Sequence, residues 1–579
     1  MYPRTVKVRS SNGTLHEYVR VVEAYRDGGK VKQRVVADLG PKEQLLSILP
    51  KLHRLLAGEA AEAAEPHFLE APTWGPVLAV RSLFEQLGLW DILDRELGRA
   101  KSVPFADRAF VLVANRLIAP ASEHGLAGWL ETDFVCDRKG RRFVPHWHQR
   151  RRVRIHPRQL DAWYRTLDQL LAAKGKIEVA LYGRLRDLFS IKPNLVLYDI
   201  TSTYFEGAGP RDFARHGHSR DGKSQNVQVI VGVVMVAGWP IAHHVCAGNR
   251  VDHSTVQEVI EDLCKRFEFS RIVFVGDRGM VTDENIASIK KDKHGFLFGV
   301  KRRRNADLDG WLNAVDDAKW VACPGGMNTQ ERKTDPPRTR AQEVPSGDPA
   351  LRVIVIDSDE RRAYEEAKRT QAMERARQKL EKLQARVAAG KVKLPEKIGA
   401  AVERIMQKYH GCRYFDWKLE DGALKFWESD ERFGREKKIE GKYVIMTSEK
   451  ELGVLEAVAL YKELTDVENG FRQLKDVMAL RPIYHQIESR VKAHIFVAAL
   501  ALLVQRLLGR RLQDAGVTFS PARALEALST VRLVTFRLEG QPRRQGMAGG
   551  SSDARLVLKA LKIADQRPPV PPTTEATVM

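Results

Sequence analysis

The sequence lacks the cysteine patterns of disulfide-bonded and zinc-binding proteins. Its 579 residues include five cysteines, at positions 136, 246, 264, 323 and 412, and no Cys-x-x-Cys pair. An odd number of dispersed cysteines in a long chain excludes a disulfide framework and gives a zinc site little support. The same usage favours a reducing compartment.

Long apolar runs are also missing. The first residues, "MYPRTVKVRSSNG", contain no apolar core of the kind that signal peptides have. The longest clear apolar run, Ile495 to Val504, is too short to span a bilayer and predicts a buried helix instead. We therefore expect no membrane partner.

Acidic residues are in deficit. The chain has 95 lysines and arginines against 74 acidic residues, a net charge of +21, which favours a polyanionic partner over solubility alone. Positive charge is densest between Arg138 and Arg158, with Phe143 and Trp147 interleaved. We predict that this stretch contacts the DNA backbone, chiefly through Arg150, Arg151 and Arg152. A solvated loop is the alternative.

The pattern along the chain predicts a multidomain α+β protein. Residues 1–65 alternate polar and apolar residues around Asp-Gly-Gly and predict a β-hairpin region, and residues 66–190 predict a helical, basic domain that binds DNA. Residues 191–303 and 441–530 predict a catalytic domain that is split by an insertion domain at 304–440. Residues 531–579 predict a partly disordered tail.

Within the first catalytic segment the order of elements is informative. The patterns predict strands over 195–206, 227–237 and 241–246, a helix over 255–267, a strand over 272–276, a helix over 283–291 and a strand over 296–300. This order is typical of a ribonuclease-H-like core, a mixed sheet with helices.

Three carboxylates stand out in this frame. Asp199 and Asp277 each end an apolar strand-like run, and Glu468 lies on a downstream helix. Carboxylate oxygens are the ligands that Mg²⁺ prefers, and two ions about 4 Å apart can activate a nucleophile and stabilise a leaving oxygen. We predict that Asp199 bridges two ions and that Asp277 and Glu468 each complete one side. Taken alone, each aspartate could instead end a strand in a turn or cap a helix.

The helix around Glu468 has two stripes. Its apolar residues recur at helical spacing and predict a face packed on a core; they are Val467, Phe471, Leu474 and Met478. Tyr461, Glu468 and Lys475 are seven residues apart in turn, which is two turns of helix. We predict that Tyr461 and Lys475 contact the phosphates of a bound strand, although a solvated helix face has the same pattern.

One motif is misleading. Residues 217–224, "GHSRDGKS", satisfy the P-loop pattern, but a P-loop follows a buried strand and opens a helix, whereas a strand-like run follows here. We expect no bound nucleotide.

The strings "YDITSTYFEG" and "GDRGM", the Tyr461–Glu468–Lys475 spacing and the following "LRPIYHQIESRVKAHIFVAALAL" resemble the DDE transposases of bacterial insertion sequences, in particular the insertion-sequence-four superfamily. The family motif is Tyr-x2-Arg-x3-Glu-x6-Lys. Leu464 stands here where the arginine is expected, and we expect Arg472, one turn after Glu468, to supply that charge.

The resemblance implies a cut-and-paste DNA transposase that uses two Mg²⁺ or Mn²⁺ ions per active site. Its partners would be double-stranded DNA, as terminal inverted repeats and as target, and a second copy of the chain in a synaptic dimer. It would work in the bacterial cytoplasm, on the nucleoid when bound to DNA. In that family a tryptophan of the insertion can stack on a flipped base; the candidates here are Trp311, Trp320, Trp417 and Trp427. A metal-dependent nuclease or resolvase, and an inactive transposase-derived DNA-binding protein, remain the alternatives.

Overall fold

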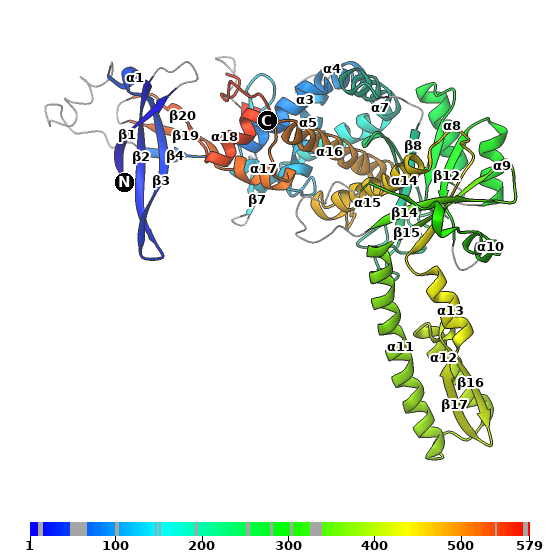
Figure 1. Cartoon of the computed structure of the whole chain (residues 1–579). Coiled ribbons are helices and arrows are strands. Elements are labelled where there is room, and N and C mark those ends of the chain that lie inside the picture. The colour runs from blue at the N-terminus through cyan, green and yellow to red at the C-terminus, as the bar shows by residue number, and fades with distance from the viewer. Residues whose placement is uncertain are drawn as a thin grey trace.

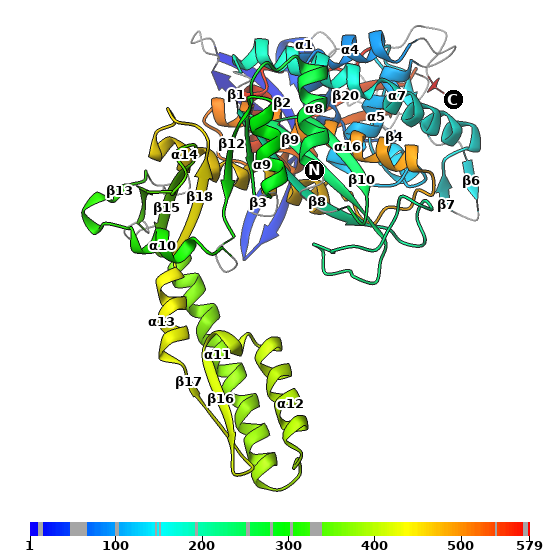
Figure 2. The same ribbon diagram turned by 90° about the vertical axis from the view of Figure 1, so that its right-hand side faces the viewer.

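The computed structural model is a mixed α+β protein with an N-terminal β-sheet, a helical region and a large mixed sheet (Figures 1 and 2). It describes residues 1–9, 15–46, 67–98, 104–144, 147–149, 152–191, 195–250, 255–277, 282–301, 305–324, 338–538, 541–570 and 577–578.

The N-terminal region forms an antiparallel sheet of β1 (Tyr2–Arg9), β2 (Leu15–Asp27) and β3 (Lys30–Pro41), followed by α1 (Lys42–Leu46). The predicted turn at Asp-Gly-Gly joins β2 to β3, and both of its glycines have positive φ. The prediction of a hairpin missed β1, because an edge strand of polar and apolar residues is specified by pairing with its neighbour.

The helical region is completed by the end of the chain. Its elements are α3 (Gly75–Gln86), α4 (Leu89–Glu96), α5 (Phe105–Ile118), α6 (Leu126–Thr132), α7 (Pro157–Phe189), α16 (Glu488–Asp514), α17 (Pro521–Leu528) and α18 (Ser552–Ala560). Short strands accompany them: β5 (Arg142–Phe143), β6 (Trp147–Gln149), β7 (Arg152–Arg154) and β21 (Thr577–Val578). The order of the small sheet is β20 (Arg544–Gly549), β19 (Val531–Arg537) and β4 (His67–Glu70).

Part of the predicted tail is therefore ordered. β19 pairs with β4, β20 contacts β3, α18 packs on α16 and α17, and Trp74 donates a hydrogen bond from Nε1 to the carbonyl of Gln566 (2.7 Å). A composition rich in arginine and proline did not reveal these contacts, because those with β4, β3 and Trp74 join residues at opposite ends of the chain.

Helix α16 packs between α5 and α7. By length and composition it could cross a membrane, but 83% of its most apolar stretch is buried inside the protein. It is a core helix, as predicted.

The central sheet has nine strands in the order β10-β9-β8-β11-β12-β18-β15-β14-β13. They are β8 (Leu195–Tyr204), β9 (Gln228–Val236), β10 (Trp239–Ala247), β11 (Val273–Gly276), β12 (Gly295–Gly299), β13 (Val321–Ala322), β14 (Thr339–Val344), β15 (Arg352–Ser358) and β18 (Lys442–Thr447). Connecting helices are α8 (Val256–Phe267), α9 (Asp283–Lys291), α10 (Leu308–Asn313) and a 3-10 turn (Asp317–Lys319). β8, β11 and β12 run parallel, whereas β9, β10 and β18 run antiparallel to their neighbours.

The predicted insertion differs in extent from the projecting arm of the structure. β13, β14 and β15 extend the central sheet beyond β18, so residues up to Ser358 belong to the body. The arm consists of α11 (Asp359–Ala388), α12 (Pro395–Lys408), a 3-10 turn (Gly411–Arg413), β16 (Phe415–Glu420), β17 (Ala423–Glu428) and α13 (Asp430–Ile439). The 30-residue α11 alone extends about 45 Å.

The arm has a small core of its own. Leu380, Leu383, Ile398, Val402 and Phe415 are buried together in it, separate from the core of the body. Alternating charges on α11 thus mark its solvated side, whereas its apolar residues hold α12 and the β16–β17 hairpin.

Candidate active site

The parallel register of β8 and β11 places the two aspartates side by side. Leu195 pairs with Val273 and Leu197 with Val275, so each residue of β8 faces the one 78 positions later. Asp199 and Asp277 are also 78 positions apart. Asp199 lies inside β8, not at its end as expected, and Asp277 directly follows β11.

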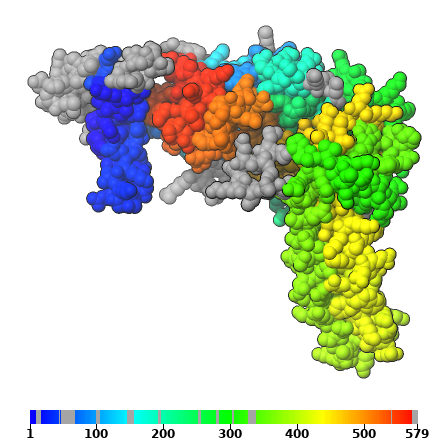
Figure 3. Space-filling view, viewed as in Figure 1, coloured from blue at the N-terminus to red at the C-terminus, as the bar shows by residue number. Residues whose placement is uncertain are grey.

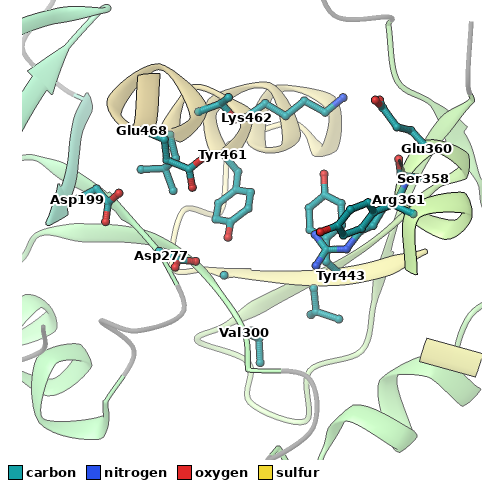
Figure 4. A pocket seen from close by; sticks show the side chains of 15 residues that line it. Asp199, Asp277, Val300, Ser358, Glu360, Arg361, Tyr443, Tyr461, Lys462 and Glu468 are labelled. Atoms are coloured by element: carbon teal, nitrogen blue, oxygen red, sulfur yellow. Dashed lines mark hydrogen bonds between the residues drawn. The ribbon is translucent and has the colours of Figure 1, made fainter. Parts of the chain in front are cut away.

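Helix α15 (Leu464–Arg472) supplies the third carboxylate and packs on β8. The apolar face predicted for this helix is confirmed: its four members, Val467, Phe471, Leu474 and Met478, are all buried. Because that face is held against the core, Glu468 is turned toward the two aspartates (Figure 4).

The three carboxylates are close enough to influence one another's protonation. Burial, with the charges of Asp277 and Glu468, raises the pKa of Asp199 to about 7, against a hydrogen bond from the Ile200 amide (2.8 Å). Burial and then the charge of Asp277 raise the pKa of Glu468, which Arg472 opposes. Three repelling carboxylates form a site that favours a cation.

These carboxylates share one cavity of about 510 Å³. Its other walls come from β12, from β18, from the start of α11 and from the end of α14 (Val454–Lys462). They are lined by Gly299, Val300, Ser358, Glu360, Arg361, Tyr364, Tyr443, Val444, Tyr461, Lys462, Leu464 and Thr465. Asp199, Asp277 and Glu468 occupy one end, and Arg361, Tyr443 and Glu360 the other (Figure 4).

Tyr461 lies in this cavity, as its predicted role requires. Its hydroxyl rests against the backbone of β12, where a Cβ on Gly299 would come within 2.1 Å of the Tyr461 oxygen. Its ring centroid lies 6.1 Å from that of Tyr443, and the Arg361 guanidinium lies 5.1 Å from the same Tyr443 ring.

Lys475 occupies a different place from the predicted stripe. The helix breaks at Glu463, between α14 and α15, and then continues as a π-helical turn over Gln473–Val477. Since a π-turn is wider than an α-turn, Lys475 rotates off the face of Glu468. It does not line the cavity, and its contact with DNA remains a prediction.

Lys475 instead belongs to a buried ion cluster. Asp221 accepts from Lys475 Nζ at 2.7 Å and pairs with Arg481 at 2.5 Å, and the Asp221 and Lys475 side chains are 5% and 9% exposed. Asp221 lies on the long connection between β8 and β9, in the stretch that imitates a P-loop. A strand, β9, follows that stretch, as predicted. The cluster ties this connection to the segment after α15.

The remaining predicted DNA contacts are not tested by the geometry. Arg472 ends α15 and lies near Glu468, as expected from its place in the sequence. Arg152 begins β7, whereas Arg150 and Arg151 lie outside the described residues.

The four candidate tryptophans do not line the cavity. Trp311 is buried on α10, Trp320 faces Arg340, Trp417 donates to Glu403, and Trp427 is exposed on β17. Sequence reasoning missed the aromatic and basic residues that do line it, among them Arg361 and Tyr443. Arg361 lies in the segment predicted as an insertion and Tyr443 in the second predicted catalytic segment, and no local pattern connects either residue to Asp199.

The donor set fits a divalent cation. Three carboxylates on rigid elements offer hard oxygen ligands, and a bound cation would offset the burial, and the repulsion by Asp277 and Glu468, that raise the pKa of Asp199. DDE transposases generally use divalent metals of this kind, and Asp199, Asp277 and Glu468 are the residues that would hold them.

Comparison with known proteins agrees with this site. The profile of the transposase DDE domain matches residues 192–504, more than half of the chain, and that of the IS1634 family transposase N-terminal domain matches residues 3–71. No curated protein sequence is significantly similar to the chain.

Two solved structures show a distant likeness. One is the piggyBac transposase synaptic complex with hairpin DNA, at 11% identity and a TM-score of 0.35, over 80% of this chain and 82% of that chain. The other is the Mos1 mariner paired end complex with Mn, at 14% identity and a TM-score of 0.12, over 43% and 65%. Neither score is high enough to bear on the fold or function. The match across the catalytic segments, together with the converging carboxylates, shows that the chain belongs to the DDE transposases, enzymes that catalyse DNA transposition.

Proposed function

We propose that the chain performs cut-and-paste transposition, with Asp199, Asp277 and Glu468 as its catalytic carboxylates. The observation that supports this most is their convergence on one cavity from β8, β11 and α15, elements separated by up to 269 residues of sequence (468 − 199). A structural role for each acid would not require that the three meet.

The proposed chemistry is phosphodiester hydrolysis followed by transesterification. Two Mg²⁺ or Mn²⁺ ions, when bound, would activate a water or a 3′-hydroxyl and stabilise the leaving oxygen. Asp199, on which the charges of both other carboxylates act, would be the acid that contacts both ions, while Tyr461 and Arg361 line the wall along which a phosphate backbone could lie. Rigid positioning by a sheet and a packed helix keeps these groups in place before the substrate arrives.

Finer assignments belong to the same proposal. The element order from β8 to β12 supports a ribonuclease-H-like core, and the matching positions of Tyr461, Glu468 and Lys475 support the insertion-sequence-four superfamily. Because two element ends must be held together, we propose a dimer on the terminal repeats that then joins them to target DNA. Five free cysteines agree with action in the cytoplasm.

Asp277→Asn tests the proposal. The substrate is a labelled duplex copied from an end of the genetic element that encodes the chain, with a target plasmid and Mg²⁺. The variant should bind the duplex as wild type does and fail to cut it, whereas the control Asp292→Asn, an exposed aspartate after α9, should cut normally.

The wild-type products discriminate the alternatives. Joined products support transposition, cleavage without joining supports a nuclease or resolvase, and binding without cleavage supports an inactive DNA-binding protein. Cleavage by Asp277→Asn at the wild-type rate would refute the metal-binding role.

A further inference from the structure

The N-terminal sheet carries a projecting two-stranded ribbon. β1 pairs with β2 only as far as Val22, and beyond that point β2 and β3 pair alone, from Glu23–Arg34 to Asp27–Lys30, around the Gly28–Gly29 turn. Its five residue pairs extend about 17 Å. Every residue from 24 to 36 is exposed. A two-stranded ribbon without a core is marginally stable by itself, so its exposed surface indicates a partner.

The two faces of the ribbon differ in charge. On one face Arg26 lies opposite Val31 and Ala24 lies opposite Gln33, with no acidic side chain among them. Val31 is 65% exposed, and Arg26 forms no ion pair with the described part of the chain.

The other face carries the acids, and they are already neutralised. Asp27 pairs with Lys32 at 2.7 Å and Glu23 with Arg34 at 2.6 Å. Lys30, beside the turn, has no ion pair in the described residues and adds an unbalanced positive charge at the tip. The ribbon therefore carries net positive charge, and the exposed Val31 lies opposite Arg26.

This surface has the dimensions and chemistry of a major-groove reader. The major groove admits a two-stranded β-ribbon, arginine recognises guanine there, and apolar side chains contact the thymine methyl group. A lysine at the tip is suited to a flanking phosphate.

The ribbon projects away from the body, as the arm does (Figure 1). It extends from the body in the same direction as the arm formed by α11 to α13, and the acid cavity opens at the base of that arm (Figures 1 and 2). The space-filling view shows ribbon and arm projecting from the body on the same side (Figure 3).

We propose that the β2–β3 ribbon enters the major groove of the terminal repeat, inside the element and away from the cleaved end, with Arg26 on a base edge and Lys30 on a phosphate. This inference rests on the proposed function, since it needs a DNA end in the cavity. It assigns sequence recognition to the ribbon and leaves cutting to the carboxylates.

Arg26→Ala and Lys30→Ala, in the full chain, test the ribbon. The probes are duplexes copied from the two ends of the encoding element and a shuffled duplex of equal length. Lys290→Ala is the control, because Lys290 is equally exposed but lies on α9, at the opposite end of the body (Figure 1).

The two variants should fail differently. Arg26→Ala should lose about tenfold in affinity for the end duplex and little for the shuffled one. Lys30→Ala should weaken binding to both duplexes and make the salt dependence of binding shallower by about one counterion. Both should lose footprint protection at the internal part of the repeat and retain it at the cleaved end, and Lys290→Ala should match wild type.

Each outcome decides the proposal. Unchanged affinity and footprint in both ribbon variants would overturn the proposal. Variants that bind DNA normally but no longer self-associate in the absence of DNA would also overturn it, because the ribbon would then be a protein interface. Failure of the proposed catalysis is a separate outcome. If wild type does not cut DNA but the ribbon variants still lose footprint protection inside the repeat, DNA recognition by the ribbon is supported and the proposed catalysis is refuted.

Discussion

The buried ion cluster around Asp221 predicts that the family lysine supports the fold of the site. Asp221→Asn keeps the shape of the side chain and removes its charge, which leaves Lys475 buried without a counter-ion. Breaking a buried ion pair from one side costs about 3–5 kcal/mol. The side chains of Asp221 and Lys475 are 5% and 9% exposed, so solvent screens this pair little. We expect the variant to lose about 3 kcal/mol of stability.

The second ion pair of Arg481 provides a matched control. Arg481 also pairs with Asp476 at 2.6 Å, but the Asp476 side chain is 53% exposed, so Asp476→Asn should change stability by less than about 1 kcal/mol. Asp221→Asn/Lys475→Met removes both buried charges and should recover most of the loss, because no buried charge is then left unpaired.

Thermal unfolding of wild type, Asp221→Asn, Asp476→Asn, Lys475→Met and the double variant measures the effect on stability. Metal-dependent cleavage of an end duplex by the same proteins measures the effect on activity. A loss of about 3 kcal/mol should lower the melting temperature by roughly 6–12 °C. Cleavage should also fall, since the cluster anchors the segment that follows the Glu468 helix. Equal and small shifts for Asp221→Asn and Asp476→Asn would contradict the reasoning. So would a Lys475→Met variant of unchanged stability that had lost only DNA binding.

Three further predictions concern the cavity itself. Asp199 has a pKa of about 7 in the folded protein against an ordinary 3.8, a difference of about 4 kcal/mol. Because the raised folded-state pKa makes the charged form of Asp199 costly, the stability of the metal-free protein should fall as pH rises from about 4 to 7. In EDTA, Asp199→Asn should therefore have a higher melting temperature than wild type at pH 8 and the same melting temperature at pH 4. Equal melting temperatures of the two proteins at both pH values would refute this. Gly299→Ala should lower the free energy of unfolding by about 1–3 kcal/mol, because the added methyl group displaces the Tyr461 hydroxyl. Adding Tyr461→Phe to that variant should restore part of the melting temperature. If it does not, the strain lies elsewhere. Leu464→Arg, at a position that lines the cavity, should keep or raise cleavage, and complete loss would show that another residue already compensates.

The local elements of the catalytic segment could be predicted from the sequence. The fully buried β9 follows from a continuous apolar run and the buried face of α15 from helical periodicity, and both signals depend on neighbouring residues alone. The order of strands and helices from β8 to β12 was confirmed for the same reason. Glu468 could be placed to one side of the core face of its helix because that face was already visible in the spacing of Val467 and Phe471.

Elements whose existence depends on remote pairing were predicted less well. β1 is held by β2, and β13 to β15 extend a sheet whose neighbouring strand, β18, comes about 85 residues after β15 (442 − 358 = 84). Their own sequences carry weak patterns, so the hairpin and the insertion were drawn with different limits from those of the structure. β19 was assigned to a tail because its partner, β4, lies near the other end of the chain.

The sequence by itself determined which residues could do the chemistry: two aspartates on apolar strands, a glutamate on an amphipathic helix and an excess of positive charge. Tertiary structure alone decided that they meet, through a parallel register whose offset equals the spacing of Asp199 and Asp277. It also decided that Lys475 turns away to Asp221, because a helix break and a π-turn rotate it off the expected face. Periodicity is local, whereas register and ion pairing are fixed by contacts between segments hundreds of residues apart.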